Sequence, residues 1–220
     1  MKFTLLTLFP EMLGPFLEGS ILGRAVKTGI IEVEVRNLRD WALGKHKIVD
    51  DAPYGGGAGM VLKVDVIDRA LNELASKKDI KILLTPQGER FTQKIAGELA
   101  DSKKHLVLIA GHYEGFDERV RKLVDREISI GDYILTGGEL PAAVIVDTIA
   151  RLVPGVLGNP RSLDSESHSS QRHDFPTYTR PDAYTPASRP ELGILSVPDI
   201  LKSGNHASIN AWRLKQAQPR

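Results

Sequence analysis

Cysteine is absent from this sequence of 220 residues. Its absence excludes a disulfide-bonded scaffold, a zinc ribbon held by thiolates and a cysteine nucleophile. A chain without disulfides fits a reducing compartment, so the expected location is the cytoplasm.

An excess of charge is also lacking, since 29 Lys and Arg residues stand against 28 Asp and Glu, for a formal net charge of +1. Folded RNA can be recognised by shape and a few placed cations, so this balance neither requires nor excludes an RNA partner. No apolar run reaches the length of a membrane span. The apolar start, residues 2–8, is interpreted as a strand rather than a signal peptide, because Pro10 and Glu11 end it early.

What the sequence does contain is an alternation of short apolar runs with helical patterns over residues 1–158. This alternation predicts an α/β fold with a parallel sheet. Strands are expected at 2–8, 30–36, 80–85, 105–110 and 125–130, and helices at 10–18, 20–28, 64–76, 93–101, 117–124 and 140–153, with Ser20 and Thr92 as helix caps. Such sheets bind ligands beyond the carboxyl ends of their strands, which here are followed by loops rich in glycine.

The composition changes after Gly158. Residues 159–175 are polar, rich in serine and without apolar periodicity, and they are interpreted as a linker that is disordered in the free protein. Residues 176–195 are rich in Pro and Tyr, and two short helices are expected near 197–203 and 206–217. The sequence therefore predicts a domain at 1–158, a linker at 159–175 and a small helical domain at 176–220.

Three glycine-rich segments are candidate ligand loops. The first, residues 50–60 (DDAPYGGGAGM), allows a close approach of backbone to ligand, although its spacing fits neither a P-loop nor a dinucleotide fingerprint. Residues 111–119 (GHYEGFDER) and 129–141 (SIGDYILTGGELP) each follow an apolar run directly. The alternatives are a flexible surface loop for the first and ordinary turns for the others, with Asp117 as a cap and His112 as a polar residue with satisfied hydrogen bonds.

Arg151 ends an otherwise apolar helix. A cation near the carboxyl terminus of a helix is stabilised by the helix dipole, and this role alone would account for Arg151.

Seven motifs occur in one order: DDAPYGGGAGM, LLTPQG, GHYEGFDERV, SIGDYILTGGELP, RLVPGVLG, YTRP and SGNHASINAWR. In this order and spacing the chain resembles the bacterial tRNA (guanine-N1)-methyltransferases of the TrmD type, from Phe9 to Arg213. The resemblance implies a SPOUT-type fold, in which the C-terminal part of the α/β core is tied in a trefoil knot. It also implies a homodimer with active sites at the interface, and the apolar helix 140–153 fits a dimer contact.

The resemblance further implies that the knot loops bind S-adenosylmethionine. Carried over onto this sequence, the cofactor-binding residues are Leu83, Leu84, Thr85, Pro86, Gly111, Tyr113, Glu114, Gly115, Ser129, Ile130, Gly131, Tyr133, Leu135, Gly137, Gly138 and Pro141.

Methylation of guanine N1 needs a general base, because N1 carries a proton. Negative charge develops on O6 as this proton leaves, so a fixed cationic donor helps. The resemblance assigns the donor to Arg151 and the base to a linker aspartate. Here the chain departs from the family, since Glu166-Ser167-His168 stands where relatives have Asp-Ser-Phe. Glu166 is the candidate base, and Asp164 is its alternative if the linker shifts by two residues.

The partner implied by the resemblance is tRNA, with a guanosine immediately 3′ of the anticodon as the methylated nucleoside. The matching tRNA-binding positions are Tyr54, Gly55, Gly59, Arg180, Ser203, Asn205, His206 and Arg213. In the family methylation is helped by magnesium, but no metal-ligating set is assigned in this sequence.

Two other functions stay open from the residues. One keeps the fold and cofactor but methylates ribosomal RNA or another tRNA position, against which the C-terminal motifs argue. The other is a non-catalytic RNA-binding protein, favoured by the altered linker at Glu166 and opposed by the cofactor loops and Arg151.

Overall fold

The computed structural model describes residues 1–158 and 175–217. The chain forms two compact units, residues 1–160 and 161–220. The expected linker at 159–175 therefore falls almost wholly outside the described residues, and so do both candidate bases, Glu166 and Asp164.

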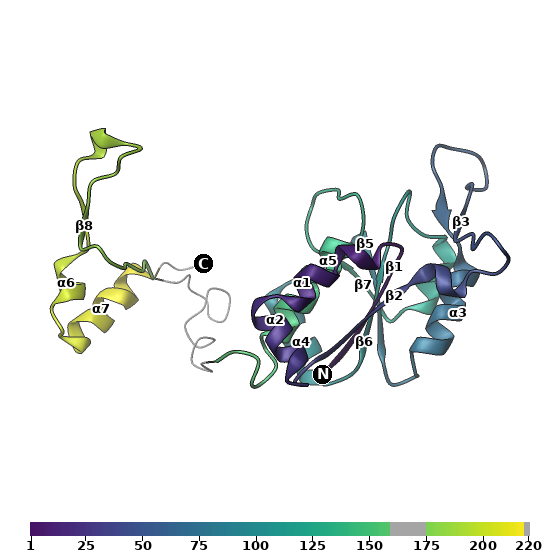
Figure 1. Ribbon diagram of the computed structural model, residues 1–220, viewed down its shortest axis with the longest axis horizontal. Coiled ribbons are helices and arrows are strands. Elements are labelled where there is room, and N and C mark those ends of the chain that lie inside the picture. The colour runs from purple at the N-terminus through teal and green to yellow at the C-terminus, as the bar shows by residue number, and fades with distance from the viewer. Residues whose placement is uncertain (159–174, 218–220) are drawn as a thin grey trace. The chain divides into compact units, whose positions relative to one another are not determined.

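The first unit is built on a five-stranded sheet whose neighbouring strands all run parallel, in the order β2-β1-β6-β5-β7 (Figure 1). Its strands are β1 (Lys2–Thr7), β2 (Glu32–Asn37), β5 (Ile80–Arg90), β6 (Leu106–Ala110) and β7 (Arg126–Ser129). This confirms the α/β class, the parallel sheet and the five expected strands. A separate pair, β3 (Asp50–Asp51) and β4 (Val61–Leu62), runs antiparallel at the two ends of the first glycine-rich loop.

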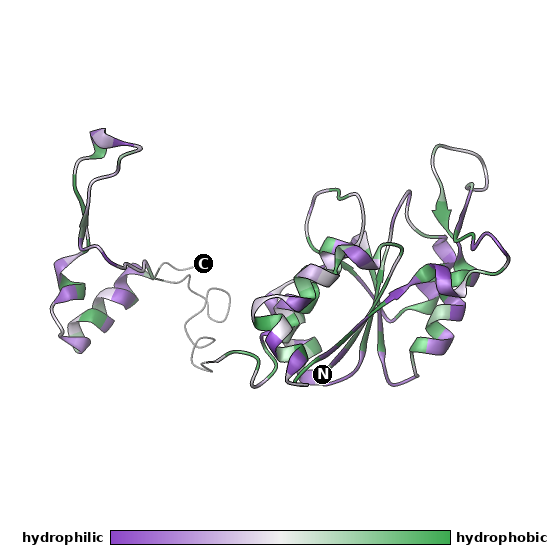
Figure 2. Cartoon of the chain, in the orientation of Figure 1, coloured by the Kyte–Doolittle hydropathy of each residue, from purple (hydrophilic) through white to green (hydrophobic). Residues whose placement is uncertain are grey.

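Helices cover both faces of the sheet. Successive residues of a strand point to opposite faces, so strands with consecutive apolar residues place apolar side chains on both faces. Leu106 and Leu108 of β6 belong to one core cluster, whereas Val107 and Ile109 belong to the other. Figure 2 shows apolar residues along the strands and polar residues mainly on the outer sides of the helices. Within the described part of the chain, no helix is long and apolar enough to span a membrane.

The first cluster is covered by α1 (Gly14–Glu18), α2 (Ser20–Lys27), α4 (Gln93–Ser102) and α5 (Glu139–Ala150). The second is covered by two 3₁₀ segments, η2 (Leu38–Trp41) and η3 (Glu118–Leu123), and by α3 (Val64–Leu74).

Several expected elements differ in their bounds or type. The helix expected at 10–18 is divided into a 3₁₀ turn, η1 (Pro10–Met12), and α1, and that at 117–124 is the 3₁₀ helix η3. The helix expected at 140–153 is α5, which ends at Ala150. Thr92 caps α4 as expected, by accepting a hydrogen bond from the Ile95 amide at 3.4 Å, whereas Gly19 rather than Ser20 caps α2.

β5 extends past its expected end at residue 85, because its last residues pair with the end of β7. The register shifts between Leu84 and Glu89, so that both of these residues lie opposite Ile128. The strand therefore carries an arch over residues 85–88 at its carboxyl end. A long-range pairing of this kind leaves no periodic signal in the local sequence.

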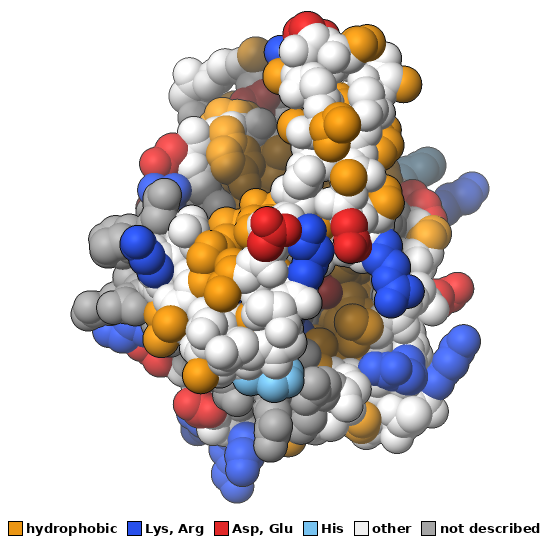
Figure 3. Space-filling view, turned by 90° about the vertical axis from the view of Figure 1, so that its left-hand side faces the viewer, with side chains coloured by type: hydrophobic (Ala, Val, Ile, Leu, Met, Phe, Trp, Pro, Cys, Tyr) orange, Lys and Arg blue, Asp and Glu red, His pale blue; other side chains and the backbone are white. Residues whose placement is uncertain are grey.

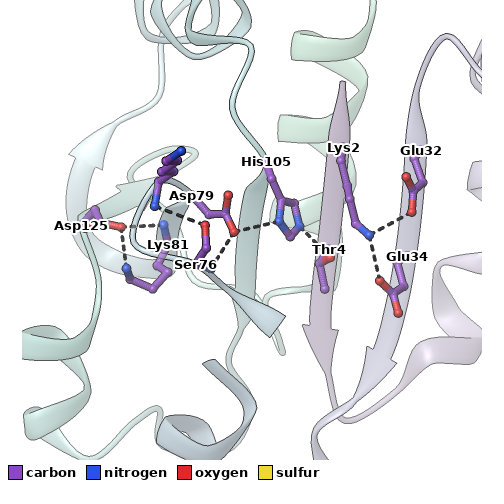
Figure 4. Close-up of polar contacts among 10 residues, drawn as sticks. Lys2, Thr4, Glu32, Glu34, Ser76, Asp79, Lys81, His105 and Asp125 are labelled. Carbon is purple, nitrogen blue, oxygen red and sulfur yellow. Dashed lines mark hydrogen bonds and ion pairs between the residues drawn. The ribbon is translucent and has the colours of Figure 1, made fainter. Parts of the chain in front are cut away.

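The amino end of the sheet is closed by a row of polar contacts that crosses the strands (Figure 4). Lys2 bridges Glu32 and Glu34 at 2.9 and 3.5 Å. The fully buried Thr4 hydroxyl lies 2.8 Å from His105 Nε2, and His105 Nδ1 lies 3.3 Å from Asp79 Oδ2. These contacts fix the starts of β1, β2, β5 and β6 relative to one another.

The second unit contains two helices, α6 (Asp199–Lys202) and α7 (His206–Gln216), and a hairpin of β8 (Ala183–Tyr184) with β9 (Leu195–Ser196) joined through η5 (Pro190–Leu192). The helices lie close to the expected positions, but the hairpin was not expected from its Pro-rich sequence. Figure 3, which faces this unit, shows hydrophobic side chains over the hairpin, and Tyr184, Ile194 and Leu195 are exposed there.

We predict that Asp79→Asn lowers the free energy of unfolding at pH 7 by about 1.5–3 kcal/mol, the usual range for a hydrogen bond to a charged group. Burial alone would raise the pKa of Asp79, but hydrogen bonds from Ser76 and His105 outweigh it and lower the pKa below its ordinary value. A lowered carboxyl pKa contributes stability above the unfolded-state pKa of about 3.9, and this contribution is lost as pH falls through the folded-state pKa. Urea denaturation from pH 7 to pH 3 should show the two proteins converging at low pH, and a constant difference would refute the assignment.

Candidate functional site

The loops that follow three adjacent strands surround one cavity of about 530 Å³ at the carboxyl end of the sheet. They are the arch of β5, the segment after β6 and the segment between β7 and α5. All sixteen residues predicted to bind the cofactor line this cavity. Their convergence follows from the strand order, because parallel strands bring their carboxyl ends to one edge.

Two glycines allow these loops to lie closer together than other residues would permit. A Cβ on Gly138 would lie 2.7 Å from Ala110 Cα and from the Gly111 nitrogen, and one on Gly88 would lie 2.5 Å from the Glu127 carbonyl carbon. Both distances are below ordinary van der Waals contact, and the opposing atoms are backbone atoms that cannot swing away. The Gly138 amide also donates a hydrogen bond of 2.8 Å to the Gly111 carbonyl.

The first glycine-rich loop is fastened to the loop after β6. The Leu62 amide donates to the Gly115 carbonyl at 2.9 Å, the Glu114 amide donates to the Met60 carbonyl at 3.0 Å, and Gly59 lies against the Glu114 side chain. Of the positions predicted to bind tRNA in this loop, Gly59 thus lies beside the cavity wall. Tyr54 is fully exposed, and Gly55 follows it.

Charged groups at the cavity wall are mostly carboxylates. Glu114, Asp117 and Glu118 line it, against one guanidinium, that of Arg121. Hydrogen bonds from the Arg119 guanidinium, opposed by burial, lower the pKa of Asp117 below its ordinary value, so Asp117 is negatively charged at neutral pH. Asp117 is paired with Arg119 at 2.7 Å and Glu118 with Arg121 at 3.2 Å, so among the described residues Glu114 is the wall carboxylate without a cationic partner. A cationic or hydroxyl-rich ligand would find an acceptor at Glu114.

Some residues of the wall were not among the sixteen. Gln87 and Arg121 line the cavity and are hydrogen-bonded to each other, and His112 lines it as well. The alternative in which His112 is a polar residue with satisfied hydrogen bonds is not supported, because its buried Nδ1 has no hydrogen-bond partner among the described residues. Glu139 was also missed, and it is buried behind the wall with only 2% of its surface exposed. An acidic residue at the start of an otherwise apolar helix is the signal that could have found it.

Arg151 does not line this cavity. It caps the carboxyl end of α5, whereas Pro141 in the first turn of that helix lines the cavity. Ten residues separate them, which is about 15 Å along a helix rising 1.5 Å per residue. The described residues of one chain thus do not bring the predicted O6 donor and the predicted cofactor loops together.

The predicted tRNA-binding positions of the second unit fall into two groups. Arg180, His206 and Arg213 line a cavity of about 390 Å³ within this unit. Arg213 also lies over the Phe175 ring, 4.9 Å from its centroid. Ser203 and Asn205 instead serve the backbone, since the Asn205 amide donates to Ser203 Oγ at 3.2 Å and Asn205 Oδ1 caps α7.

No three His, Asp or Glu side chains gather closely enough to hold a metal ion anywhere in the described part of the chain. Magnesium stays a prediction of the resemblance, without assigned ligands.

Comparison with known proteins gives one consistent result. A family model described as tRNA (Guanine-1)-methyltransferase TrmD matches residues 1–220. The protein named tRNA (guanine-N(1)-)-methyltransferase in Deinococcus deserti is 50% identical over 220 residues, which cover 100% of this chain and 78% of that protein. The proteins of that name in Deinococcus radiodurans and Thermus thermophilus are 51% and 49% identical, covering 100% and 99% of this chain and 77% and 87% of their own lengths.

We predict that Gly138→Ala destabilises the first unit by about 1–3 kcal/mol, the cost of overpacking against atoms that cannot move. The matched control is Gly97→Ala in α4, where a Cβ would meet nothing within 4 Å. That change should raise stability by about 1 kcal/mol through helix propensity. Urea denaturation measures both, and a Gly138→Ala protein as stable as the wild type would show that the loops need no such approach.

Proposed function

The chain belongs to the tRNA (guanine-1)-methyltransferase TrmD family, and on that premise we propose that it methylates N1 of the guanosine immediately 3′ of the anticodon. It is a methyltransferase that acts on guanine N1 of tRNA, like its relatives at about half sequence identity. The cavity at the carboxyl end of the sheet carries the proposal, because it gathers all three loops of the family in one chain.

The cavity suits S-adenosylmethionine in size and in chemistry. Its volume lies within the range of small-molecule sites, about 300–1,000 Å³. Leu83, Ile130 and Leu135 offer apolar surface for an adenine ring. Residues 130–137 lie in neither helix nor strand, so their N–H and C=O groups can bond the edge of the base. The Glu114 carboxylate can serve a ligand that carries a sulfonium and an ammonium group, whereas Asp117 is already paired with Arg119.

We assign two further roles in the reaction to this chain's own residues. S-adenosylmethionine, when bound, supplies an electrophilic methyl group. Glu166 takes the proton from guanine N1 as general base, with Asp164 as its alternative. Arg151 donates to O6 and stabilises the charge that develops there. The remaining contribution of the protein is to hold N1 in line with the methyl group, which is where most of the rate enhancement is expected.

These roles require a homodimer in which the Arg151 of one subunit serves the cavity of the other, because Arg151 and the cavity lie at opposite ends of α5. The face suited to pairing two subunits is apolar. Leu140 and Val144 form an exposed stripe on α5, and Met12, Phe16 and Ile21 are exposed on the neighbouring α1–α2 layer. Large apolar side chains exposed over one layer indicate a protein–protein contact.

We propose that the connection from β7 to α5 passes through the arch of β5 as the trefoil knot of the family. Its support is the strand order, since β7 lies at the edge beside β5, whereas α5 packs on β6 and β1 beyond it. The chain must therefore cross the end of β5 to reach α5. On either side of this connection the backbones approach closely, Gly88 against β7 and Gly138 against the end of β6.

The anticodon stem is proposed to bind where the first glycine-rich loop meets the loop after β6. The second unit holds adjacent nucleotides through Arg180, His206 and Arg213. Aromatic and guanidinium planes stack on unpaired bases, and these residues line a cavity with Phe175 and Tyr178.

Methyl transfer from labelled S-adenosylmethionine to two tRNA transcripts tests the function. We expect label on the transcript with guanosine immediately 3′ of the anticodon, preceded by a guanosine, and none when adenosine replaces the target. With the first transcript, Glu166→Gln should lower the rate about 10²–10⁴-fold and Asp164→Asn should leave it nearly unchanged. Reversal of the two variants would make Asp164 the base. Cofactor binding without label on either transcript would favour another RNA substrate or a non-catalytic role.

A second prediction concerns the shared site. Arg151→Ala and Glu114→Ala proteins should each be nearly inactive, because one lacks the O6 donor and the other a cavity carboxylate. Co-expression of both should restore about one quarter of wild-type activity, since half of randomly formed dimers are mixed and each mixed dimer has one intact site. Activity of the whole co-expressed dimer population is the measurement, and no recovery would place each site within a single subunit.

A further inference from the structure

One buried carboxylate has no part in the proposed reaction. Glu139, the first residue of α5, is 2% exposed, and its Oε1 accepts a hydrogen bond of 2.6 Å from the hydroxyl of Thr7 at the end of β1. The Thr7 hydroxyl in turn accepts from the Phe9 amide at 2.9 Å. Glu139 therefore ties the end of β1 to the start of α5, and its second oxygen remains for another partner.

That partner is His112 of the cavity wall. Glu139 Oε2 lies 3.6 Å from His112 Nδ1, which is the buried atom without a hydrogen bond among the described residues. The Gly137 backbone is pressed against both groups, because a Cβ there would overlap Glu139 Oε2 and His112 Nδ1. The imidazole packs against the Phe9 ring at 4.6 Å and the Tyr113 ring at 5.4 Å.

The residue after His112 has a strained backbone. Tyr113 has a φ of +58°, in the left-handed region that a bulky side chain rarely occupies. Such strain persists only where the surroundings hold it, and it is concentrated at functional sites. Tyr113 and Glu114 both face the cavity, so whatever fixes His112 also sets how these two side chains meet a ligand.

We propose that Glu139 and His112 form a positioning pair for the methyl donor. The carboxylate holds the imidazole, the imidazole holds the left-handed turn at Tyr113, and the turn presents Tyr113 and Glu114 to the cavity. The contact shortens to a hydrogen bond when a ligand fills the cavity and presses the loop after β6 onto α5. This inference rests on the proposed function, in that the donor occupies this cavity.

Burial of a carboxylate argues against a purely stabilising role. An ionised group inside a protein costs several kcal/mol in desolvation, and an apolar residue of similar volume often replaces a buried ion pair without loss of stability. The Thr7 hydroxyl satisfies one carboxylate oxygen at 2.6 Å, whereas the 3.6 Å separation leaves Oε2 without a hydrogen bond to His112 in the described structure. If the hydrogen bond between Glu139 Oε2 and His112 Nδ1 forms only when a ligand binds, its free energy contributes to the affinity for that ligand.

The same fold offers a matched control at the opposite end of the sheet. There the fully buried Thr4 contacts His105, and His105 contacts Asp79, as Thr7, Glu139 and His112 are linked at the carboxyl end. None of these three control residues lines the cavity. Thr4→Val and Asp79→Asn thus test the loss of stability alone.

The experiment is calorimetric titration of the full-length protein with S-adenosylhomocysteine, together with steady-state kinetics and thermal denaturation. Glu139→Gln keeps the shape and an oxygen for Thr7 but removes the charge. We expect its Kd for S-adenosylhomocysteine and its KM for the methyl donor to rise about tenfold, with KM for tRNA unchanged. His112→Asn should behave alike, and the double variant should be no weaker than either single variant.

The two threonine variants keep the test decisive if Glu139→Gln fails to fold. Thr7→Val should weaken S-adenosylhomocysteine binding several-fold, whereas Thr4→Val should lower the melting temperature without changing the Kd. The pair would be overturned if Thr7→Val bound S-adenosylhomocysteine as tightly as Thr4→Val, or if Glu139→Gln bound it as tightly as Asp79→Asn. In either case, binding by the wild-type protein would leave the proposed function intact. A wild-type protein that binds no S-adenosylhomocysteine would refute the proposed function and the pair with it.

Discussion

The contact between Gly111 and Gly138 is the constraint on which the site depends. A hydrogen bond of 2.8 Å joins the two backbones, and no side chain larger than hydrogen fits at Gly138. This contact brings the start of α5, which follows β7 in the chain, against the end of β6, which precedes β7. The connection between β7 and α5 then lines the cavity together with the arch of β5 and the segment after β6. The cavity is thus formed where these three loops converge.

The two ends of the sheet differ in role: polar contacts at the amino end stabilise the fold, and the carboxyl end forms the cavity. At the amino end, Lys2, His105 and Asp79 hold the strand starts together with contacts that are already closed. At the carboxyl end, Asp117 and Glu118 are paired with Arg119 and Arg121, Glu114 remains available to a ligand among the described residues, and the His112 contact is longer than a hydrogen bond. The helix α5 begins at the cavity, and Arg151 caps its other end.

Much of the fold could be predicted from local patterns, because β1, β5 and β6 contain apolar runs, β2 alternates apolar and charged residues, and a sheet edge collects the loops that follow its strands. The register shift that carries β5 to Arg90 could not, since it depends on pairing with β7. The segment at Glu118–Leu123 was expected to be helical and is a 3₁₀ helix, capped by Asp117, whose side chain accepts from the Arg119 amide. The sixteen cavity residues came from the family resemblance. Glu139 was marked in the sequence only by its place at the start of an apolar helix, and its contacts with Thr7 and His112 need the three-dimensional structure. The described residues of one chain do not bring Arg151 to the cavity, so its predicted role could not be related to the site from one chain.

The cavity walls come from segments that begin at Leu83 and end at Pro141, and β1 and α5 must both be in place before the walls meet. A partly folded chain therefore has no binding site for the donor. By mass action, any ligand of this cavity stabilises the folded state and does not stabilise partly folded intermediates, because these cannot bind it. Occupancy of the cavity should therefore protect the folded protein from proteolysis, because a bound ligand lowers the population of opened states.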